Sequence, residues 1–198
     1  MADALTLSRR DLDAPGAPWA VVDRAHPDDV GDLWAQVTGT GHPVLWRVAG
    51  GERPEYVATG PWALTPPSGE DDVWSSEWLR DVPPFALAFA CRALACELLF
   101  AMTPAVVRAF DALSDWWSGD DVDLVAPRGR INCALAATRK PKAVEAGLVV
   151  YGAIAAAARH DDRSEVFHRL GSARCSARMA VRGIDTRAVI LRALGVRP

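Results

Sequence analysis

The spacing of apolar residues changes near residue 83, and the two parts of the chain predict different secondary structure. Before that point, short apolar runs lie between turn residues, a pattern typical of strands. Residues 18–23 and 43–49 are predicted strands. Residues 55–59 are predicted to pair back on the second of them as a hairpin, because Gly50–Gly51 supplies a turn between the two runs.

A helix is predicted between the first two strands, over residues 26–38. Pro27 suits the first helical position, and the two aspartates after it suit the positive end of the helix dipole. Gly39 marks its end. One face carries apolar residues at the spacing i, i+3, i+4 and i+7, namely Val30, Leu33, Trp34 and Val37. The expected order of elements in this part is therefore β-α-β-β.

Residues 60–82 lose this regularity, and their prolines and acidic residues predict an exposed loop. Trp62, Trp74 and Trp78 lie in or beside that loop. One interpretation is that these indoles pack over a hydrophobic core, as most tryptophans do. The other is that they are exposed contacts for a partner, because Trp is favoured at binding hot spots.

After residue 83 the apolar spacing is that of one helix after another. The first helix is expected to begin at Pro83–Pro84. Later helices are expected over 104–117, 131–139, 143–160, from a cap at Ser164 to about Val181, and from a cap at Asp185 to Gly195. The expected fold class is α+β, predominantly α, with a small N-terminal β-α-β-β unit packed on a C-terminal bundle of five to six Ala-rich helices.

Composition and charge divide the chain at the same place. Residues 1–82 hold six of the eight Trp and carry 6 basic residues against 14 acidic ones. Residues 83–158 carry 7 of each sign, and residues 159–198 carry 9 basic against 4 acidic. We expect an acidic, Trp- and Pro-rich α/β head over 1–82 and a helical bundle with basic C-terminal helices over 83–198. This uneven distribution of charge along the chain favours a protein that binds a partner over an enzyme.

Bulk properties narrow the class of protein further. The chain is acidic overall, with a pI near 5.8, which argues against nucleic-acid binding. Its first residues lack the apolar core of a secretory signal, and its four cysteines lie in Ala-rich helical segments, so we expect a cytoplasmic protein. Residues 85–102 contain two charges and residues 143–158 are short, so both are interpreted as bundle helices rather than membrane spans.

Arg174, Arg178 and Arg182 recur at four-residue spacing and are expected to form one stripe along a helix. Such a stripe suits an acidic partner or an anionic ligand, because a guanidinium holds a carboxylate with two hydrogen bonds. The alternatives are a solvated helix flank and a docking surface for the acidic head of the same chain.

Asp120, Asp121 and Asp123 cluster in a predicted loop, and carboxylates at this density can hold Mg²⁺ or Ca²⁺. The twelve-residue calcium-loop pattern is missing, and a solvated acidic loop is the alternative. A small enzyme with a metal or acid–base site on this loop, with His160 or His168 nearby, is a second hypothesis. The sequence contains no zinc-ligand spacing, nucleophile elbow or phosphate-binding loop, and no cofactor is expected.

Two resemblances bear on function. Trp19-Ala-Val-Val-Asp23, the helix after it, Val44-Leu-Trp46 and Gly60-Pro-Trp-Ala-Leu64 together resemble the opening of adaptor chaperones that load type VI secretion effectors. The Ala-rich helix pairs after residue 83 resemble helical bacterial immunity proteins. Each resemblance covers at most about a third of the chain and identifies no functional residue.

The first hypothesis is therefore a non-enzymatic protein of a bacterial cytoplasm that binds another protein, of the adaptor, chaperone, immunity or scaffold type. Its expected contacts are the three tryptophans of the loop and the arginine stripe. The metal or acid–base enzyme is the alternative. A third hypothesis is binding of an anionic ligand or nucleic acid through the arginine stripe, which predicts weakening by salt.

Overall fold

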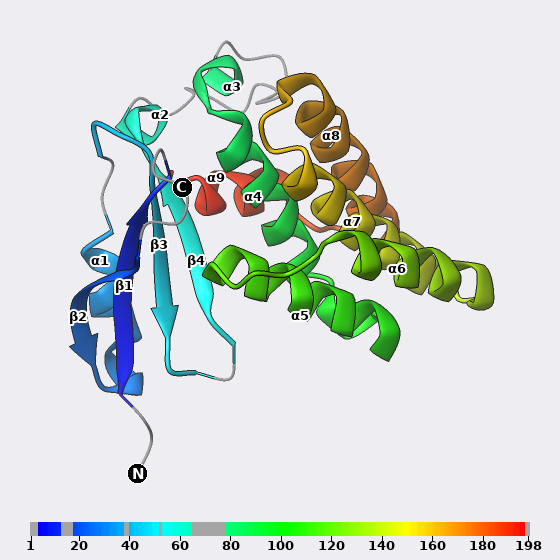
Figure 1. The fold of residues 1–198 in the computed structure, drawn as a ribbon, viewed down its shortest axis with the longest axis horizontal. Coiled ribbons are helices and arrows are strands. Elements are labelled where there is room, and N and C mark those ends of the chain that lie inside the picture. The colour runs from blue at the N-terminus through cyan, green and yellow to red at the C-terminus, as the bar shows by residue number, and fades with distance from the viewer. Residues whose placement is uncertain (1–3, 13–17, 38–39, 52, 65–77, 197–198) are drawn as a thin grey trace. The chain divides into compact units, whose positions relative to one another are not determined.

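The computed structural model describes residues 4–12, 18–37, 40–51, 53–64 and 78–196 (Figure 1). It divides into two compact units. Unit 1 consists of Met1–Val82 together with Leu191–Pro198, and unit 2 consists of Pro83–Ile190. The fold is α+β, with an antiparallel sheet in unit 1 and a helical bundle in unit 2, as the sequence predicts.

Unit 1 is built on a four-stranded antiparallel sheet in the order β2-β1-β3-β4. Its strands are β1 (Leu5–Asp11), β2 (Ala20–Ala25), β3 (Val44–Ala49) and β4 (Glu55–Thr59). The predicted strands correspond to the last three, whereas β1 was not predicted. It lies in the middle of the sheet between β2 and β3, so the order of elements is β-β-α-β-β.

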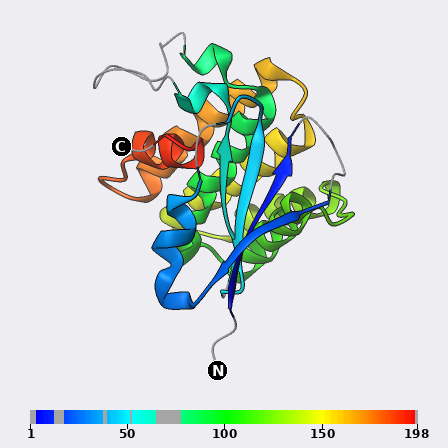
Figure 2. The same ribbon diagram turned by 90° about the vertical axis from the view of Figure 1, so that its left-hand side faces the viewer.

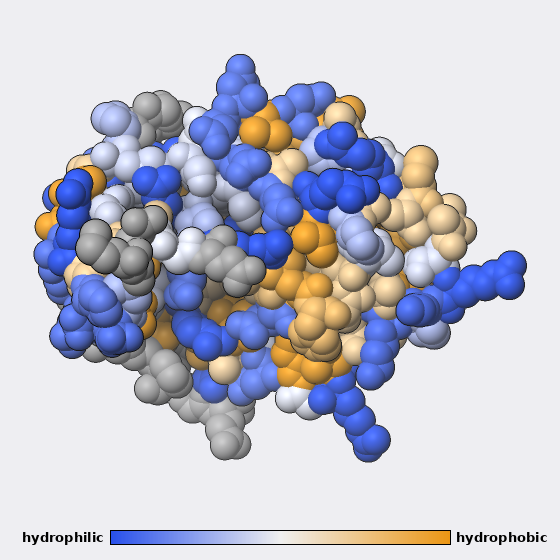
Figure 3. Space-filling view, turned by 90° about the horizontal axis from the view of Figure 1, so that it is seen from below, coloured by the Kyte–Doolittle hydropathy of each residue, from blue (hydrophilic) through white to orange (hydrophobic). Residues whose placement is uncertain are grey.

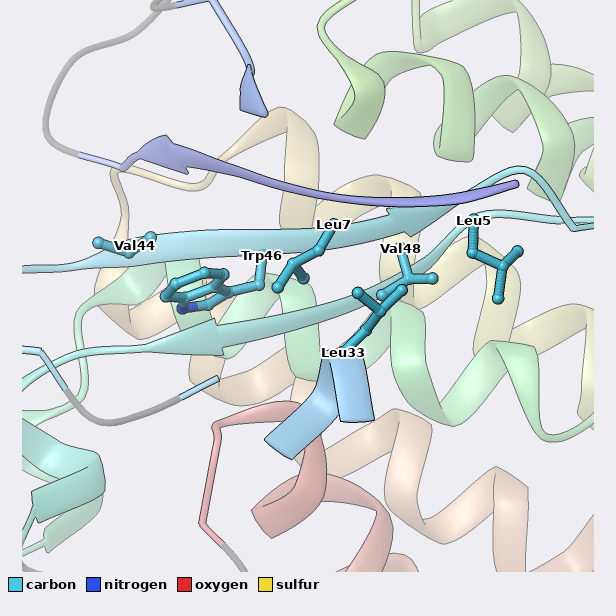
Figure 4. Packing of buried hydrophobic residues seen from close by; sticks show 6 residues of the cluster. All are labelled: Leu5, Leu7, Leu33, Val44, Trp46 and Val48. Carbon is cyan, nitrogen blue, oxygen red and sulfur yellow. The ribbon is translucent and has the colours of Figure 1, made fainter. Parts of the chain in front are cut away.

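One face of this sheet, which we call the first face, is covered by a short helix. The segment predicted as one helix forms a 3-10 turn, η1 (Pro27–Asp29), followed by α1 (Val30–Ala35). Figure 2 shows α1 beside the strands. Leu33 of α1 is fully buried against the sheet. Figure 4 shows the cluster that it joins, formed by Leu5, Leu7, Val44, Trp46 and Val48.

The C-terminal residues complete unit 1. Two short helices, α2 (Pro61–Leu64) and α3 (Trp78–Asp81), follow the sheet, and residues 65–77 between them lie outside the described residues. The indole nitrogen of Trp62 donates a hydrogen bond of 3.0 Å to the carbonyl oxygen of Leu194. Gly195 has a φ of +73°, and a Cβ there would lie 2.5 Å from the Thr59 side chain. The sequence analysis had assigned this terminal segment to the helical bundle.

Unit 2 is a bundle whose helices follow one another through short connections (Figure 1). They are α4 (Pro84–Cys96), the 3-10 turn η2 (Leu99–Ala101), α5 (Pro104–Ser118), α6 (Val125–Ala137), α7 (Pro141–Ala158), α8 (Arg163–Ala180) and α9 (Thr186–Ala193). The last three residues of α9 belong to unit 1. The predicted bundle of five to six helices is confirmed.

The helix α7 lies at the centre of unit 2 and packs against α4, α5, α6 and α8. It is long and apolar enough to cross a membrane by length and composition, but 61% of its residues are buried within the structure. Its glycines allow close packing. A Cβ at Gly147 would lie 2.6 Å from the Leu135 side chain, and Gly152 faces Ala173 of α8.

Several predicted helix boundaries differ from the structure, among them those of α7, which was expected over 143–160 and spans Pro141–Ala158. The helix expected over 131–139 is α6, which begins at Val125. Pro127 is tolerated inside it because residues in the first turn of a helix donate no intrahelical hydrogen bond. The helix expected to be capped by Ser164 is instead capped two residues earlier, by Asp162, which accepts from the Glu165 amide at 3.1 Å. That helix ends at Ala180, after which Val181 is extended.

Candidate functional site

The structure buries the two described tryptophans of the predicted binding loop. Trp62 is 3% exposed and Trp78 is 8% exposed. The Trp78 indole donates to the carbonyl oxygen of Trp62 at 2.7 Å, and the Trp62 indole donates to that of Leu194. Trp74 lies outside the described residues. In this structure Trp62 and Trp78 act as core residues of unit 1, and a contact with a partner stays a prediction.

The predicted arginine stripe is shortened by the end of α8. Arg174 and Arg178 lie one turn apart on that helix, with Arg174 partly buried and Arg178 exposed. Arg182 follows the extended residue Val181, so it does not continue the helical spacing. It is exposed. The three guanidiniums therefore do not form one helical row, and any joint binding role for them stays a prediction.

The acidic residues Asp120, Asp121 and Asp123 are all exposed in the connection between α5 and α6. The Asp123 carboxylate accepts from the Val125 amide at 2.8 Å, so it bonds a backbone N–H in the first turn of α6. Among the described residues, no group of three His, Cys, Asp or Glu side chains is placed to hold a metal ion.

Within the described part of the chain, neither histidine of the second hypothesis joins this acidic connection by a hydrogen bond. The Nδ1 atom of His160 lies 2.9 Å from the carbonyl oxygen of Ala157, and its ring packs against Phe85 and Trp116 with centroids 5.3 and 5.8 Å away. His168 is exposed on α8. Beside Trp116, partial burial raises the pKa of Asp115, and the negative charges of Asp120 and Asp111 raise it further.

A hollow between α5 and α6 presents a different surface, which we call the α5–α6 groove. Its lining residues are Ala105, Arg108, Ala126, Gly129, Arg130, Cys133 and Ala134. Apart from the two arginines, the lining side chains are small and without charge. The groove lies wholly within unit 2.

The sequence of α6 explains the shape of the groove. The lining positions on α6 follow the spacing of one helix face: they lie three, four, seven and eight residues after Ala126. A Cβ at Gly129 would meet no atom within 4 Å, so this face is open. Only Pro127 and Ile131 of α6 are buried, whereas Val125 is 75% exposed. The helix therefore presents most of its surface outward.

The rim of the groove is basic. Arg108 and Arg130 belong to its lining and are both exposed. The segment from Val125 to Lys142 contains five basic residues and no acidic one, and all five are exposed: Arg128, Arg130, Arg139, Lys140 and Lys142. Figure 3 shows apolar and hydrophilic side chains next to one another on the face below, where α5 and α6 lie.

A fork of hydrogen bonds anchors α6 to the centre of the bundle. The Nε and Nη2 atoms of Arg128 donate to the phenol oxygen of Tyr151 at 3.0 and 2.7 Å. Arg169 of α8 lies 5.9 Å from the same ring and forms an ion pair of 2.7 Å with Glu165. The Arg128 and Arg169 contacts to the Tyr151 ring link α6, α7 and α8.

Comparison of the chain with protein-family models, curated proteins and solved structures finds no match to any of them.

The sequence analysis did not identify the α5–α6 groove. Two signals in the sequence point to it in retrospect: the helical spacing of small residues from Ala126 to Ala134, and the run of basic residues without acidic ones from Val125 to Lys142. The first was missed because α6 was expected to begin at Ile131. The second was hidden because charges were counted over 83–158, where the acidic residues of other helices balance it.

Proposed function

We propose that this protein acts by binding another protein, and that the α5–α6 groove is the surface that it uses. The observation that carries the proposal is the combination of a small, uncharged lining with exposed guanidiniums at Arg108 and Arg130. Small side chains let another backbone approach closely, and guanidiniums at the edge select negative charge.

The occupant that this chemistry suits is an acidic helical segment of a partner protein. Its apolar residues would lie over Gly129 and Cys133, and its Asp or Glu side chains would meet the arginines of the rim. The five basic residues between Val125 and Lys142 extend the positive charge beyond the groove. Such a field accelerates the encounter with an acidic segment and weakens with ionic strength.

Crosslinking and the native cysteines together provide a direct test of the groove. Cys133 lies in the groove and is exposed, Cys175 is exposed on α8, and Cys91 is buried. A photo-crosslinking residue at Ala126 would capture the partner from native cells, and mass spectrometry would map the segment that it touches. A synthetic peptide of that segment should protect Cys133 from maleimide labelling and leave Cys175 labelled.

Two glycines give a matched pair of variants for the same peptide. Gly129 lines the groove and Gly171 lies on α8, and a Cβ at either position would meet no atom within 4 Å. Gly129→Leu should fill the groove and weaken binding at least tenfold, whereas Gly171→Leu should leave the affinity unchanged. Charge reversal at Arg108 and Arg130 should also weaken binding and reduce its salt dependence.

Three results would refute the proposal: a captured segment without acidic residues, equal labelling of Cys133 with and without the peptide, or equal loss of affinity in the two leucine variants. Parallel alanine variants of Trp62, Trp78 and Arg178 would then test the surfaces expected from the sequence.

A further inference from the structure

A cluster of aromatic rings lies in unit 2, where α4 begins and where α5 and α7 end. Phe89 and Trp117 form its buried base, with ring centroids 5.3 Å apart. Phe85, Trp116 and His160 lie around this base and are all partly exposed, and we call these three rings the outer aromatic layer. The layer is therefore accessible to a small solute or to the side chain of another protein.

The rings of the outer aromatic layer are close to one another. The Phe85 centroid lies 6.4 Å from that of Trp116 and 5.3 Å from that of His160, and the last two are 5.8 Å apart. A cation is attracted to an aromatic ring when it lies within about 6 Å of the ring centroid. A cation bound at this layer would therefore interact with more than one ring.

The described part of the chain supplies no cation to this layer. Guanidiniums lie 4.2 to 5.9 Å from the ring centroids of Trp19, Phe89, Phe110 and Tyr151. Within the described residues, no Arg or Lys side chain lies over the ring of Phe85 or Trp116 in this way. The outer aromatic layer therefore differs from the clusters in which an arginine of the chain covers the ring.

The surroundings of the layer are negative. Residues 111–123 contain five acidic residues and no basic one, and residues 159–163 contain two of each sign. Trp116 lies in the last turn of α5, and His160 follows the end of α7 by two residues. The C-terminal end of a helix carries a partial negative charge. Two negative poles therefore meet the one positive pole that α4 contributes at Phe85.

The pKa of Asp115 reflects this excess of negative charge beside Trp116. Burial raises the pKa, and the carboxylates of Asp120 and Asp111 raise it further. A cation bound beside Trp116 would relieve the repulsion among these carboxylates. The electrostatics therefore favour a positively charged ligand.

His160 adds a hydrogen-bond acceptor to the layer. Its Nδ1 atom lies 2.9 Å from the carbonyl oxygen of Ala157. Because a carbonyl oxygen can only accept, Nδ1 carries the proton, and Nε2 of the neutral ring is an acceptor. Within the described residues, no hydrogen bond uses Nε2. An ammonium group that carries N–H can donate to this atom, whereas a quaternary ammonium group cannot.

We propose that Phe85, Trp116 and His160 form a binding site for an alkylammonium group, which packs against the Trp116 indole and donates a hydrogen bond to Nε2 of His160. A lysine side chain of another protein and a small free amine both carry this group. The site is independent of the α5–α6 groove, because Arg108 of the groove lies about two helical turns before Trp116 on α5.

The test follows the indole and imidazole NMR signals of the full chain during titration with three probes at one ionic strength. The probes are Nα-acetyl-lysine amide, the uncharged Nα-acetyl-norleucine amide, which has the same alkyl chain, and n-butylammonium chloride. We expect saturable shifts of the Trp116 and His160 signals with the lysine derivative and none with the norleucine derivative. Equal responses to these two, or no response to either ammonium probe, would overturn the proposal.

The third probe separates the two sources of the group. Tighter binding of the lysine derivative than of n-butylammonium would assign the site to a lysine of a partner protein. Equal or tighter binding of n-butylammonium would assign it to free amines. Tetramethylammonium should bind more weakly than n-butylammonium because it has no N–H to donate. Tighter binding of tetramethylammonium would overturn the hydrogen bond to His160.

His168 is the matched control, because it is an exposed histidine of the same unit, on α8. Trp116→Leu should weaken binding of the lysine derivative about five- to thirtyfold, the range that a cation–π contact contributes. His160→Phe keeps an aromatic ring but loses the acceptor, so it should also weaken binding, and His168→Phe should leave it unchanged. Equal effects of the two histidine variants would overturn the proposal.

The unmodified protein keeps the test valid if a variant fails to fold. In the sequentially assigned wild type, the lysine derivative should shift the ring signals of His160 and the indole signal of Trp116 and leave the ring signals of His168 in place. Equal shifts at both histidines would refute the site.

Discussion

The indole of Trp62 and the backbone carbonyl of Leu194 are joined by a hydrogen bond of 3.0 Å across 132 positions of the sequence. Both groups are buried, and both belong to unit 1. The contact holds the last residues of the chain against the helix that follows the sheet. The stability of unit 1 therefore depends on residues from both ends of the sequence.

Replacing Trp62 by Phe should destabilise unit 1 by about 1–3 kcal/mol, because the buried Leu194 carbonyl would lose its donor. Hydrogen exchange should accelerate in residues 191–196 and in β4, while α7 keeps its protection. Leu64 of the same short helix is 60% exposed, and Leu64→Ala is the control that should change little. Unchanged exchange in residues 191–196 would contradict the role given to this bond.

Two glycine-to-alanine changes should have opposite effects in unit 2. A Cβ at Gly147 would lie 2.6 Å from the Leu135 side chain, so Gly147→Ala should destabilise the bundle by about 1–3 kcal/mol, less what the alanine gains in helix propensity. Gly171→Ala meets open space and should stabilise it by about 0.5–1 kcal/mol. Urea denaturation of both variants measures the sign of each change in the free energy of unfolding. A Gly147→Ala variant as stable as the wild type, or more stable, would show that Gly147 is not a packing glycine.

The two residues at the start of α8 should differ in their contribution to stability. Asp162 accepts a hydrogen bond from the Glu165 amide, so Asp162→Ala should cost about 1 kcal/mol. Ser164 lies inside the helix and is exposed, so Ser164→Ala should stay within about 0.5 kcal/mol of the wild type. A larger loss of stability in Ser164→Ala than in Asp162→Ala, measured by thermal unfolding, would favour the cap that the sequence predicts.

Asp115 should make the bundle less stable as the pH rises. Its pKa is raised in the folded chain, first by burial and then by Asp120 and Asp111. The folded chain therefore holds this proton more tightly than the unfolded chain. Stability falls as the pH rises from the ordinary pKa of an aspartate through the raised one.

Asp115→Asn should accordingly be more stable than the wild type at pH 7, and the two should converge at a pH below the ordinary aspartate pKa, where both side chains are neutral. Urea midpoints measured across this pH range test the sign. A variant less stable than the wild type at pH 7 would contradict it.

Sequence reasoning recovered most elements because their signals are local. The hairpin of β3 and β4 follows from two apolar runs around Gly50–Gly51, and α5 follows from Thr103-Pro104 and a regular apolar face. The strand β1 carries alternating Leu5 and Leu7 before two arginines, and this weak pattern was not interpreted as a strand. Its central place in the sheet is set by pairing with β2 and β3, which a local pattern does not contain.

The candidate surfaces were harder to predict because they depend on relations between elements. The sequence at Trp62 is the same whether the indole contacts a partner or lies in a core. Only the packing of the folded chain shows which of the two applies. The α5–α6 groove requires the alignment of Arg108 on one helix with Arg130 on the next. Arg182 does not belong to the predicted stripe, because α8 ends at Ala180 and Val181 is extended. No proline or glycine directly before Val181 marks that end in the sequence.

The return of the C-terminus to unit 1 also sets an order of folding during synthesis. Residues 83–190 lie between Trp62 and its partner Leu194, and a ribosome adds roughly 5–20 residues per second. Unit 2 is complete in sequence before Leu194 is made, so it can fold while unit 1 still lacks its last segment. Residues 1–82 are then translated before unit 2, but unit 1 is completed only after it.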